Sequence, residues 1–210
     1  MNCLMSQPHD AAAERFLDAA EACYARFGPA KTSMEDVGRE AGASRATLYR
    51  HFSSRDDLLL AALTRQARRL AAEAEVYLRR RYDSVGDYLV EGLLFCLREI
   101  PERPLLGTLF TRDGLGSASR TALTSDEMLA IGVEVLRPMF EPARQQGLLK
   151  DAVRIESIIE WVLHLLASYL LAPSRVATSE DEMRELLEAM LLPAVLAPTT
   201  TGTKHGRGSE

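Results

Sequence analysis

Residues 31–55 constrain the fold of this chain more than any other stretch, because they predict two short helices joined by a tight turn. Ser33 and Asp36 have the spacing of a capping box at the start of the first helix. Gly42 follows that helix, and glycine accepts the positive φ that a sharp reversal after a helix requires. Ser44 then has the position of a second N-cap. The segment is therefore typical of a helix-turn-helix.

The second helix of this pair is expected over residues 45–52, and we call it the recognition helix because its polar side chains suit DNA. Leu48 and Phe52 share one face, which predicts that this face is buried. Arginine can donate two hydrogen bonds to guanine, and hydroxyl groups can bind phosphates or base edges. The candidate DNA-binding residues are Ser33, Ser44, Arg45, Thr47, Tyr49, Arg50, His51 and Arg55. From the pattern alone, an ordinary surface helix pair with polar faces is an alternative.

The same stretch resembles the N-terminal signature of the TetR/AcrR family of transcriptional regulators. The resemblance runs from about Ala12 to about Leu63 and includes the specific core A-G-x-S-x-x-T-L-Y-x-H-F, which begins at Ala41. Gly38 stands where the family usually has alanine, and Arg55 where it usually has lysine. Arginine keeps the positive charge, so we expect little consequence for DNA binding. The resemblance implies that the chain is a DNA-binding regulator of transcription.

The resemblance also implies an all-α fold of nine helices, three in an N-terminal helix-turn-helix head and six in a C-terminal body. Apolar residues recur at helical spacing along the chain, and strand-like alternation is absent from the sequence. The predicted helices cover about residues 11–27, 34–41, 45–52, 56–81, 84–100, 104–111, 124–146, 153–171 and 179–196. We expect a DNA-binding domain over residues 10–55, an effector-binding and dimerisation domain over residues 56–197, and a disordered tail over residues 198–210.

The distribution of charge agrees with a DNA-binding head, although the whole chain has a net charge of −5. Residues 1–55 contain seven basic and seven acidic side chains, so the deficit lies entirely in residues 56–210. The basic side chains around the recognition helix are Lys31, Arg39, Arg45, Arg50 and Arg55. Such a local basic surface matters more for DNA binding than the net charge of the chain.

The sequence argues against a secreted or membrane protein. The N-terminal ten residues lack the basic region and the apolar run of a signal peptide. The most apolar stretch, residues 158–171, is interrupted by Glu160 and His164. It is also shorter than the roughly 20 residues that a membrane span needs. We therefore expect a cytoplasmic protein with no membrane partner.

The sequence predicts no cofactor, no metal site and no catalytic residue. Cys3, Cys23 and Cys96 are widely spaced and form no C-x-x-C motif, which argues against a disulfide framework or a zinc site. An all-α metal enzyme needs a larger set of ligands than Glu160 and His164 supply. A helical protein-interaction module with a degenerate head is a further alternative, which the polar groups of the recognition helix disfavour.

By the same resemblance, the last two helices are expected to pair with those of a second subunit as a four-helix bundle. Residues 153–171 are apolar on more than one face, which suits a helix that packs on its own body and on a partner. A two-fold dimer would bind a palindromic DNA operator. The candidate interface residues are Ile158, Val162, Leu165, Tyr169, Leu187, Met190 and Leu191.

The resemblance further implies an effector pocket between the long fourth helix and the helices of residues 84–146. The candidate lining residues are Tyr88, Phe95, Phe110, Met128, Phe140, Trp161 and His164. The apolar members of this set are equally explained as core, and His164 by a position near the dimer seam. The implied function is a repressor that binds its operator as a dimer and is released by a small-molecule effector.

Overall fold

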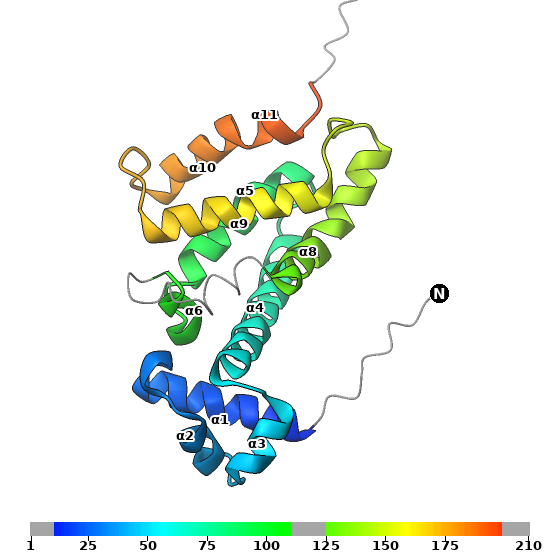
Figure 1. Ribbon diagram of the computed structural model, residues 1–210. Coiled ribbons are helices and arrows are strands. Elements are labelled where there is room, and N and C mark those ends of the chain that lie inside the picture. Colours follow the sequence, from blue (N-terminus) through cyan, green and yellow to red (C-terminus); the bar gives the residue numbers. More distant parts are fainter. Residues whose placement is uncertain (1–10, 111–124, 199–210) are drawn as a thin grey trace, which may run out of the picture.

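The computed structural model describes residues 11–110 and 125–198, and the secondary structure of these residues is helical (Figure 1). The elements are α1 (Ala11–Phe27), the 3-10 helix η1 (Pro29–Lys31), α2 (Met34–Glu40), α3 (Arg45–His51), α4 (Arg55–Arg79), α5 (Val85–Glu99), α6 (Pro104–Thr108), α8 (Asp126–Gln145), α9 (Ile155–Leu171), α10 (Glu180–Met190) and α11 (Leu192–Val195). Within these ranges no strand forms, and Leu149 and Leu196 make an isolated antiparallel bridge. The prediction of an all-α fold is confirmed.

Helices α1, α2 and α3 form a compact head at one end of the molecule (Figure 1). Phe16 of α1, Val37 of α2 and Leu48 of α3 are fully buried in its core. Burying an apolar side chain of this size contributes about 1.5–3 kcal/mol relative to leaving it in water. Because each of the three helices supplies such a side chain, the core fixes the position of α3 on the other two.

The long helix α4 connects the head to the body. At a rise of 1.5 Å per residue, its 25 residues span about 38 Å. Leu58, Leu59 and Leu63 near its start are buried in the same core as the head helices. Farther along, Ala74 and Leu78 are buried within the body. One continuous helix therefore belongs to both parts of the molecule.

A group of ion pairs joins α4 to α1, and we call it the Arg65 cluster. The Arg65 guanidinium lies 2.9 Å from a carboxylate oxygen of Glu14, 2.9 Å from one of Asp18 and 2.8 Å from one of Glu21. The Arg65 side chain is only 11% exposed. Charge pairs strengthen as water is excluded. The Arg65 cluster therefore joins α1 to α4 more firmly than surface ion pairs would.

Within the described residues, the body consists of α5, α6, α8, α9, α10 and α11. Helices α5, α6 and α8 pack on α4, whereas α9 packs on α5 and α8, and α10 packs on α5 and α11. Figure 1 shows α9 and α10 at the end of the molecule away from the head. Helix α6 packs against both α4 and α1, so a body helix also contacts the head. None of the described helices combines the length and the apolar character needed to cross a membrane.

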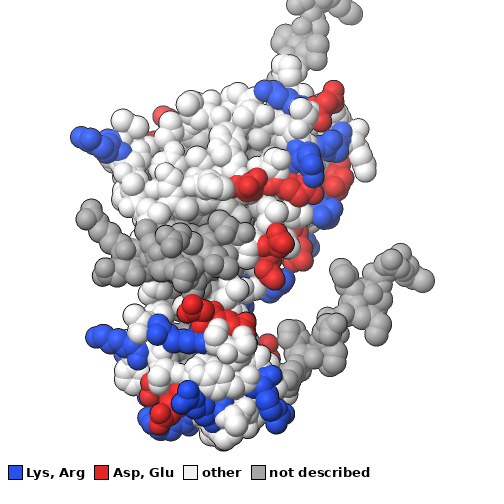
Figure 2. Space-filling view, in the orientation of Figure 1, with Lys and Arg blue, Asp and Glu red and all other residues white. Residues whose placement is uncertain are grey.

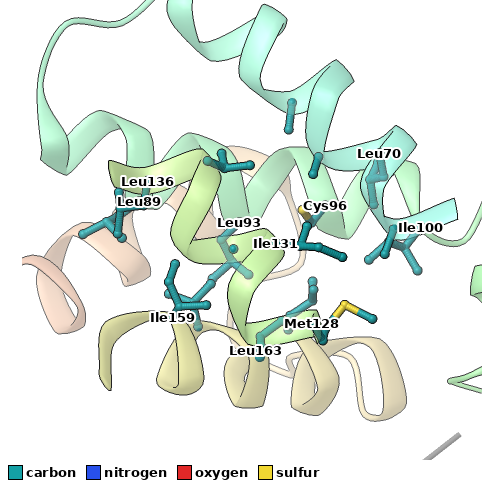
Figure 3. Close-up of a pocket in the computed structure, with 18 of the residues that line it drawn as sticks. Leu70, Leu89, Leu93, Cys96, Ile100, Met128, Ile131, Leu136, Ile159 and Leu163 are labelled. Atoms are coloured by element: carbon teal, nitrogen blue, oxygen red, sulfur yellow. The ribbon is translucent and has the colours of Figure 1, made fainter. Parts of the chain in front are cut away.

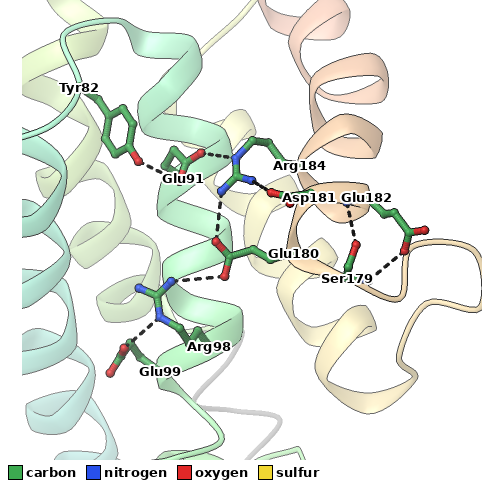
Figure 4. Close-up of polar contacts among 9 residues, drawn as sticks. All are labelled: Tyr82, Glu91, Arg98, Glu99, Ser179, Glu180, Asp181, Glu182 and Arg184. Carbon is green, nitrogen blue, oxygen red and sulfur yellow. Dashed lines mark hydrogen bonds and ion pairs between the residues drawn. The ribbon is translucent and has the colours of Figure 1, made fainter.

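Polar side chains anchor α10 on α5 (Figure 4), and we call them the Glu91 network. The carboxylate of Glu91, which is buried, accepts hydrogen bonds from Arg184 Nε at 2.6 Å and Tyr82 Oη at 3.1 Å. Arg184 also donates to Glu180 at 3.1 Å, and Glu180 lies 3.5 Å from Arg98 of α5. The hydrogen bond to Glu91 raises the pKa of the Arg184 guanidinium above its ordinary value. These contacts fix the last long helix in the body.

The predicted helix starts are largely confirmed, because capping is a local property of the sequence. Capping boxes begin α2 at Ser33 and α10 at Ser179. The N-cap of α8 is Ser125, so this helix begins slightly later than the predicted range of residues 124–146. The predicted single helix over residues 179–196 was wrong.

The last helix divides after Met190. Pro193 lies in the first turn of the short helix α11, where its lack of an N–H group has no cost. The backbone N–H of Lys150 donates to the carbonyl of Val195 at 3.0 Å, and that of Ala197 to the carbonyl of Leu148 at 2.9 Å. These bonds tie the end of α11 to the connection between α8 and α9. The predicted tail, apart from Pro198, lies outside the described residues.

Candidate functional site

The turn between α2 and α3 fixes the direction of the recognition helix. Gly42 has a φ of 61°, the left-handed conformation that glycine adopts at little cost. The N–H of Gly42 donates to Arg39 O at 3.1 Å, and the N–H of Ala43 to Gly38 O at 2.9 Å. Both bonds satisfy carbonyl groups at the end of α2, as in a Schellman motif. The turn is therefore closed by the backbone alone.

Helix α3 presents a polar face to solvent while Leu48 is buried beneath it. Arg45, Tyr49 and Arg50 are exposed on this face. The Arg45 guanidinium lies 5.2 Å from the centre of the Tyr49 ring and donates to the Tyr49 hydroxyl at 3.4 Å. Because a stacked arginine loses less freedom when it binds a partner, the pair is a preorganised donor group.

Other predicted DNA-binding residues have structural roles as well. Ser33 and Ser44 are the N-caps of α2 and α3, and the Ser44 hydroxyl lies 2.9 Å from that of Thr47. Arg55 is exposed and donates to Pro29 O at 3.1 Å, which joins the start of α4 to η1. The side chains of Ser33, Ser44 and Arg55 lie at the surface of the head, where a phosphate can approach them.

His51 lies at the contact between α3 and α1. Its ring is half-buried, and its centre lies 5.4 Å from the centre of the Phe16 ring of α1. The last turn of α3 directs this side chain toward α1, whereas Arg45 and Tyr49 point away from it. His51 therefore supports the position of α3, and its contact with DNA stays a prediction.

Basic side chains gather on the head, with acidic side chains among them (Figure 2). Arg39 lies 3.3 Å from Glu35 and 3.5 Å from Asp36 on its own helix, so its charge is partly neutralised. Hydrogen bonds from Ser33 lower the pKa of Asp36, which keeps this carboxylate charged. The net basic character near α3 therefore depends mainly on Arg45 and Arg50.

A cavity of about 160 Å³ lies in the body between α4, α5, α6, α8 and α9 (Figure 3). Its walls are almost wholly apolar. The residues that line it are Ala67, Leu70, Ala71, Ala74, Leu78, Tyr88, Leu89, Gly92, Leu93, Cys96, Ile100, Leu106, Leu109, Phe110, Met128, Ile131, Gly132, Val135, Leu136, Ile159, Val162, Leu163 and Leu166. Cavities of this size and lining stay dry and bind small apolar molecules.

On the part of the cavity wall that the structure describes, the polar groups are few and uncharged. Among the described lining residues, only Tyr88 and Cys96 carry a hydroxyl or a thiol. Burial raises the pKa of both groups, to about 12 for Cys96. Cys96 is therefore a neutral thiol at physiological pH, and its exposed surface faces the cavity. The described residues contain no group of three potential metal ligands.

The predicted pocket residues fall into two groups. Tyr88, Phe110 and Met128 line the cavity. Phe95 instead packs against Tyr77, with ring centres 5.1 Å apart, and Phe140 is fully buried in a separate part of the core. Phe95 and Phe140 are therefore not among the described residues that line the cavity.

Trp161 and His164 also lie outside the cavity, on the exposed face of α9. The Nδ1 atom of His164 is 2.7 Å from the carbonyl oxygen of Glu160 on the same helix. The sequence did not predict the aliphatic residues that form most of the wall, nor the small residues among them, namely Ala67, Ala71, Ala74 and Gly92. The recurrence of alanine at helical spacing along α4 was the available signal.

The predicted dimer residues are mostly turned inward. Ile158, Leu187 and Leu191 are buried within the chain itself, where they pack in its core. Val162 lines the cavity, while Leu165 and Tyr169 are half-buried against the core. Met190 is 68% exposed.

A different set of α9 residues faces outward, and we call it the outer stripe of α9. It consists of Ser157, Trp161, His164, Ser168 and Leu171, all of which are exposed. Their spacing alternates between four and three residues, the repeat along which two helices pack. The exposed Trp161 and Leu171 give this stripe the apolar surface that a helical partner needs.

Comparison with known proteins agrees with the head and with the whole chain. Residues 16–62 match the family described as "Bacterial regulatory proteins, tetR family". An uncharacterized HTH-type transcriptional regulator of Mycobacterium tuberculosis, Rv1255c, is 29% identical over 203 residues, which are 97% of this chain and 95% of that protein. The chain thus has the DNA-binding domain of the TetR family in its N-terminal part. It is therefore a DNA-binding transcriptional regulator and not an enzyme.

Solved structures of TetR-family proteins have the same fold. The TetR-family repressor AlkX from Dietzia sp. is 22% identical, with a TM-score of 0.63 over 86% of this chain and 93% of that one. RolR, solved in complex with its ligand resorcinol, is 17% identical, with a TM-score of 0.66 over 88% and 87% of the two chains. At these identities, the likeness establishes the TetR-like architecture of the body.

Proposed function

We propose that this chain is a ligand-responsive repressor, which binds a palindromic operator as a dimer and is released by a small-molecule effector. The observation that carries the proposal is that α4 belongs to both the head and the body. Its first turns lie in the core of the head, and Ala67, Ala71 and Ala74 of the same helix line the cavity. A molecule that enters the cavity therefore contacts the helix on which the head is built.

Two other features of α4 and α6 support this coupling. The Arg65 cluster joins α4 to α1, so a shift of α4 moves the head with it. Helix α6 contacts α1, while Leu106 of α6 lines the cavity. An effector releases DNA only to the extent that it prefers the unbound conformation, and such coupling is typically about 1–3 kcal/mol. This corresponds to a loss of operator affinity of about 5- to 150-fold.

The DNA-binding part of the proposal assigns base contacts to the exposed face of α3. Arg45, Tyr49 and Arg50 are the candidate base-contacting residues, because they are exposed and carry donors or a ring. Ser33, Ser44, Thr47 and Arg55 are the candidate phosphate contacts, which position the head without specifying sequence.

The dimer part of the proposal assigns the interface to α9 and α10, through the outer stripe of α9 and Met190. AlkX is described as a repressor, and RolR was solved with a small molecule, which supports both halves of the mechanism for a chain of the same fold. In a two-fold dimer, the two recognition helices enter successive major grooves, so the operator is palindromic.

The test is fluorescence anisotropy with labelled DNA from upstream of the gene for this chain, compared with random DNA over a range of salt concentrations. We expect palindrome-dependent binding that Arg45→Ala and Tyr49→Ala each weaken at least tenfold. Arg154→Ala, a change at the exposed N-cap of α9, is the control and leaves affinity unchanged. The repressor proposal would be wrong if the protein bound the upstream DNA no more tightly than random DNA and selection from a random DNA library gave no enriched sequence.

A further inference from the structure

The chemistry of the cavity wall restricts the kind of molecule that fits it. Every described residue on the wall is uncharged, and the side chains that dominate it are Leu, Ile, Val and Ala. A carboxylate or ammonium group placed there would lose its hydration without gaining a partner, which strongly disfavours binding. The described part of the wall therefore favours an uncharged ligand.

The shape of the cavity is elongated. Figure 3 shows Leu89 and Leu136 near one end and Leu70 and Ile100 near the other, with Leu93 between them. Leu89 and Ile100 are eleven residues apart, which corresponds to about 16 Å at the helical rise. A compact cavity of about 150 Å³ holds a benzene ring. A cavity of about 160 Å³ stretched over that length is narrower and suits a chain.

Alanine side chains form one wall of this narrow space. Ala67, Ala71 and Ala74 recur at intervals of four and three residues, so they lie on one face of α4. Gly92 of α5 also lines the cavity, with only hydrogen in place of a side chain. Small residues on two neighbouring helices leave a channel between them, whereas larger side chains would fill it.

We propose that the cavity binds an uncharged molecule with an unbranched aliphatic chain, and that this class of molecule is the effector. The inference rests on the proposed function, because it names the ligand class of the site through which release acts. Tyr88 and Cys96 allow at most one or two weak polar contacts, so affinity comes from the buried chain and rises with its length until the channel is full.

The test uses 1-alkanols of increasing chain length, titrated into the full-length protein by isothermal titration calorimetry without DNA. We expect affinity to rise about fourfold for each added CH₂ group and then to level off. Alkanoates of the same lengths, which differ by their negative charge at neutral pH, are expected to bind at least 100-fold more weakly.

Matched variants locate the binding site. Ala71→Leu places a larger side chain in the channel and is expected to weaken binding of the longest alkanol at least tenfold. Ala72→Leu makes the same change at the exposed neighbouring residue and leaves binding unchanged. Thermal unfolding of both variants shows whether each is folded. If Ala71→Leu is not folded, Gly92→Ala places a smaller side chain in the channel and replaces it in the test.

The outcomes separate this inference from the proposed function. Alkanoates that bind as tightly as alkanols, affinity independent of chain length, or the same binding by both alanine variants would each overturn the inference. Alkanols that bind as expected but leave operator affinity unchanged in the anisotropy assay would support the ligand class and refute release by it. A charged molecule that releases DNA while alkanols do not bind would refute the ligand class and support the repressor.

Discussion

The Arg65 cluster allows a quantitative prediction about the junction between head and body. In Arg65→Ala, the three carboxylates of Glu14, Asp18 and Glu21 lose their shared cation. Asp18 is 71% exposed, so its ion pair contributes little to stability. Glu21 is only 16% exposed and lies 2.9 Å from its second partner, Arg69. The loss therefore falls mainly on the pair with Glu21.

Removing one partner of a fully buried ion pair costs about 3–5 kcal/mol. The Arg65 cluster lies at the edge of the core, and Arg69 still compensates part of the charge on Glu21, so we expect a smaller loss of about 2 kcal/mol. For a chain of this size, that loss lowers the melting temperature by about 4–8 °C.

Circular dichroism during thermal and urea unfolding measures both quantities. Arg68→Ala is the matched control, because Arg68 is on the same helix but is exposed and lies 3.6 Å from Glu134. We expect it to change stability by less than about 0.5 kcal/mol. If the two variants differed by less than that amount, the argument that partial burial strengthens the Arg65 cluster would be refuted.

Three further predictions concern the body. Trp161→Glu is expected to weaken the dimer at least 100-fold in analytical ultracentrifugation. Val176→Glu, a change at an exposed residue outside the outer stripe of α9, is the control and leaves the dimer intact. Equal effects of the two changes would contradict the proposed interface. Hydrogen bonds from Thr178 and Ser179 lower the pKa of Glu182 below its ordinary value of 4.5, so its stabilisation is present above that pH and is lost as the pH falls further. Urea unfolding midpoints should then fall less steeply on the acid side in Glu182→Gln than in the wild type. Glu91→Gln is expected to lower the free energy of unfolding by about 1–2 kcal/mol, and the further change Arg184→Met should recover part of that loss. A double variant no more stable than Glu91→Gln alone would contradict this account of the Glu91 network.

The sequence predicted local features better than the orientation of side chains. The N-caps at Ser33, Ser44, Ser84 and Ser179 depend on residues within four positions of each other, so the pattern suffices to place them. The reversal at Gly42 is also local.

Helix α9 shows the limit of such patterns. Because it is apolar on most sides, the periodicity of its sequence does not fix which side faces the body. The sequence analysis placed Ile158 at the interface and Trp161 in the pocket, whereas Ile158 is buried in the core and Trp161 is exposed. The rotation of α9 is decided by its contacts with α8, the preceding helix, and with α5, which is distant in sequence.

The cavity could not be located from large side chains for a related reason. Phe140 has the properties of a pocket residue in the sequence, but its ring is enclosed by neighbours that fill the space around it. Space arises where Ala71 and Gly92 are small on adjacent helices. Which small residues face one another is a property of the packed structure.

The shared helix α4 also determines how this protein can be recombined with others. Leu58, Leu59 and Leu63 follow the predicted domain boundary at residue 55, yet they are buried in the core that contains Phe16 and Leu48. A chimaera that exchanged only residues 10–55 would leave the transplanted head without part of its own interior. A junction placed after Leu63 keeps that interior, and adding Arg65 keeps its attachment to α1. In this protein, the unit that can be transferred to another regulator is therefore the three head helices together with the first turns of α4.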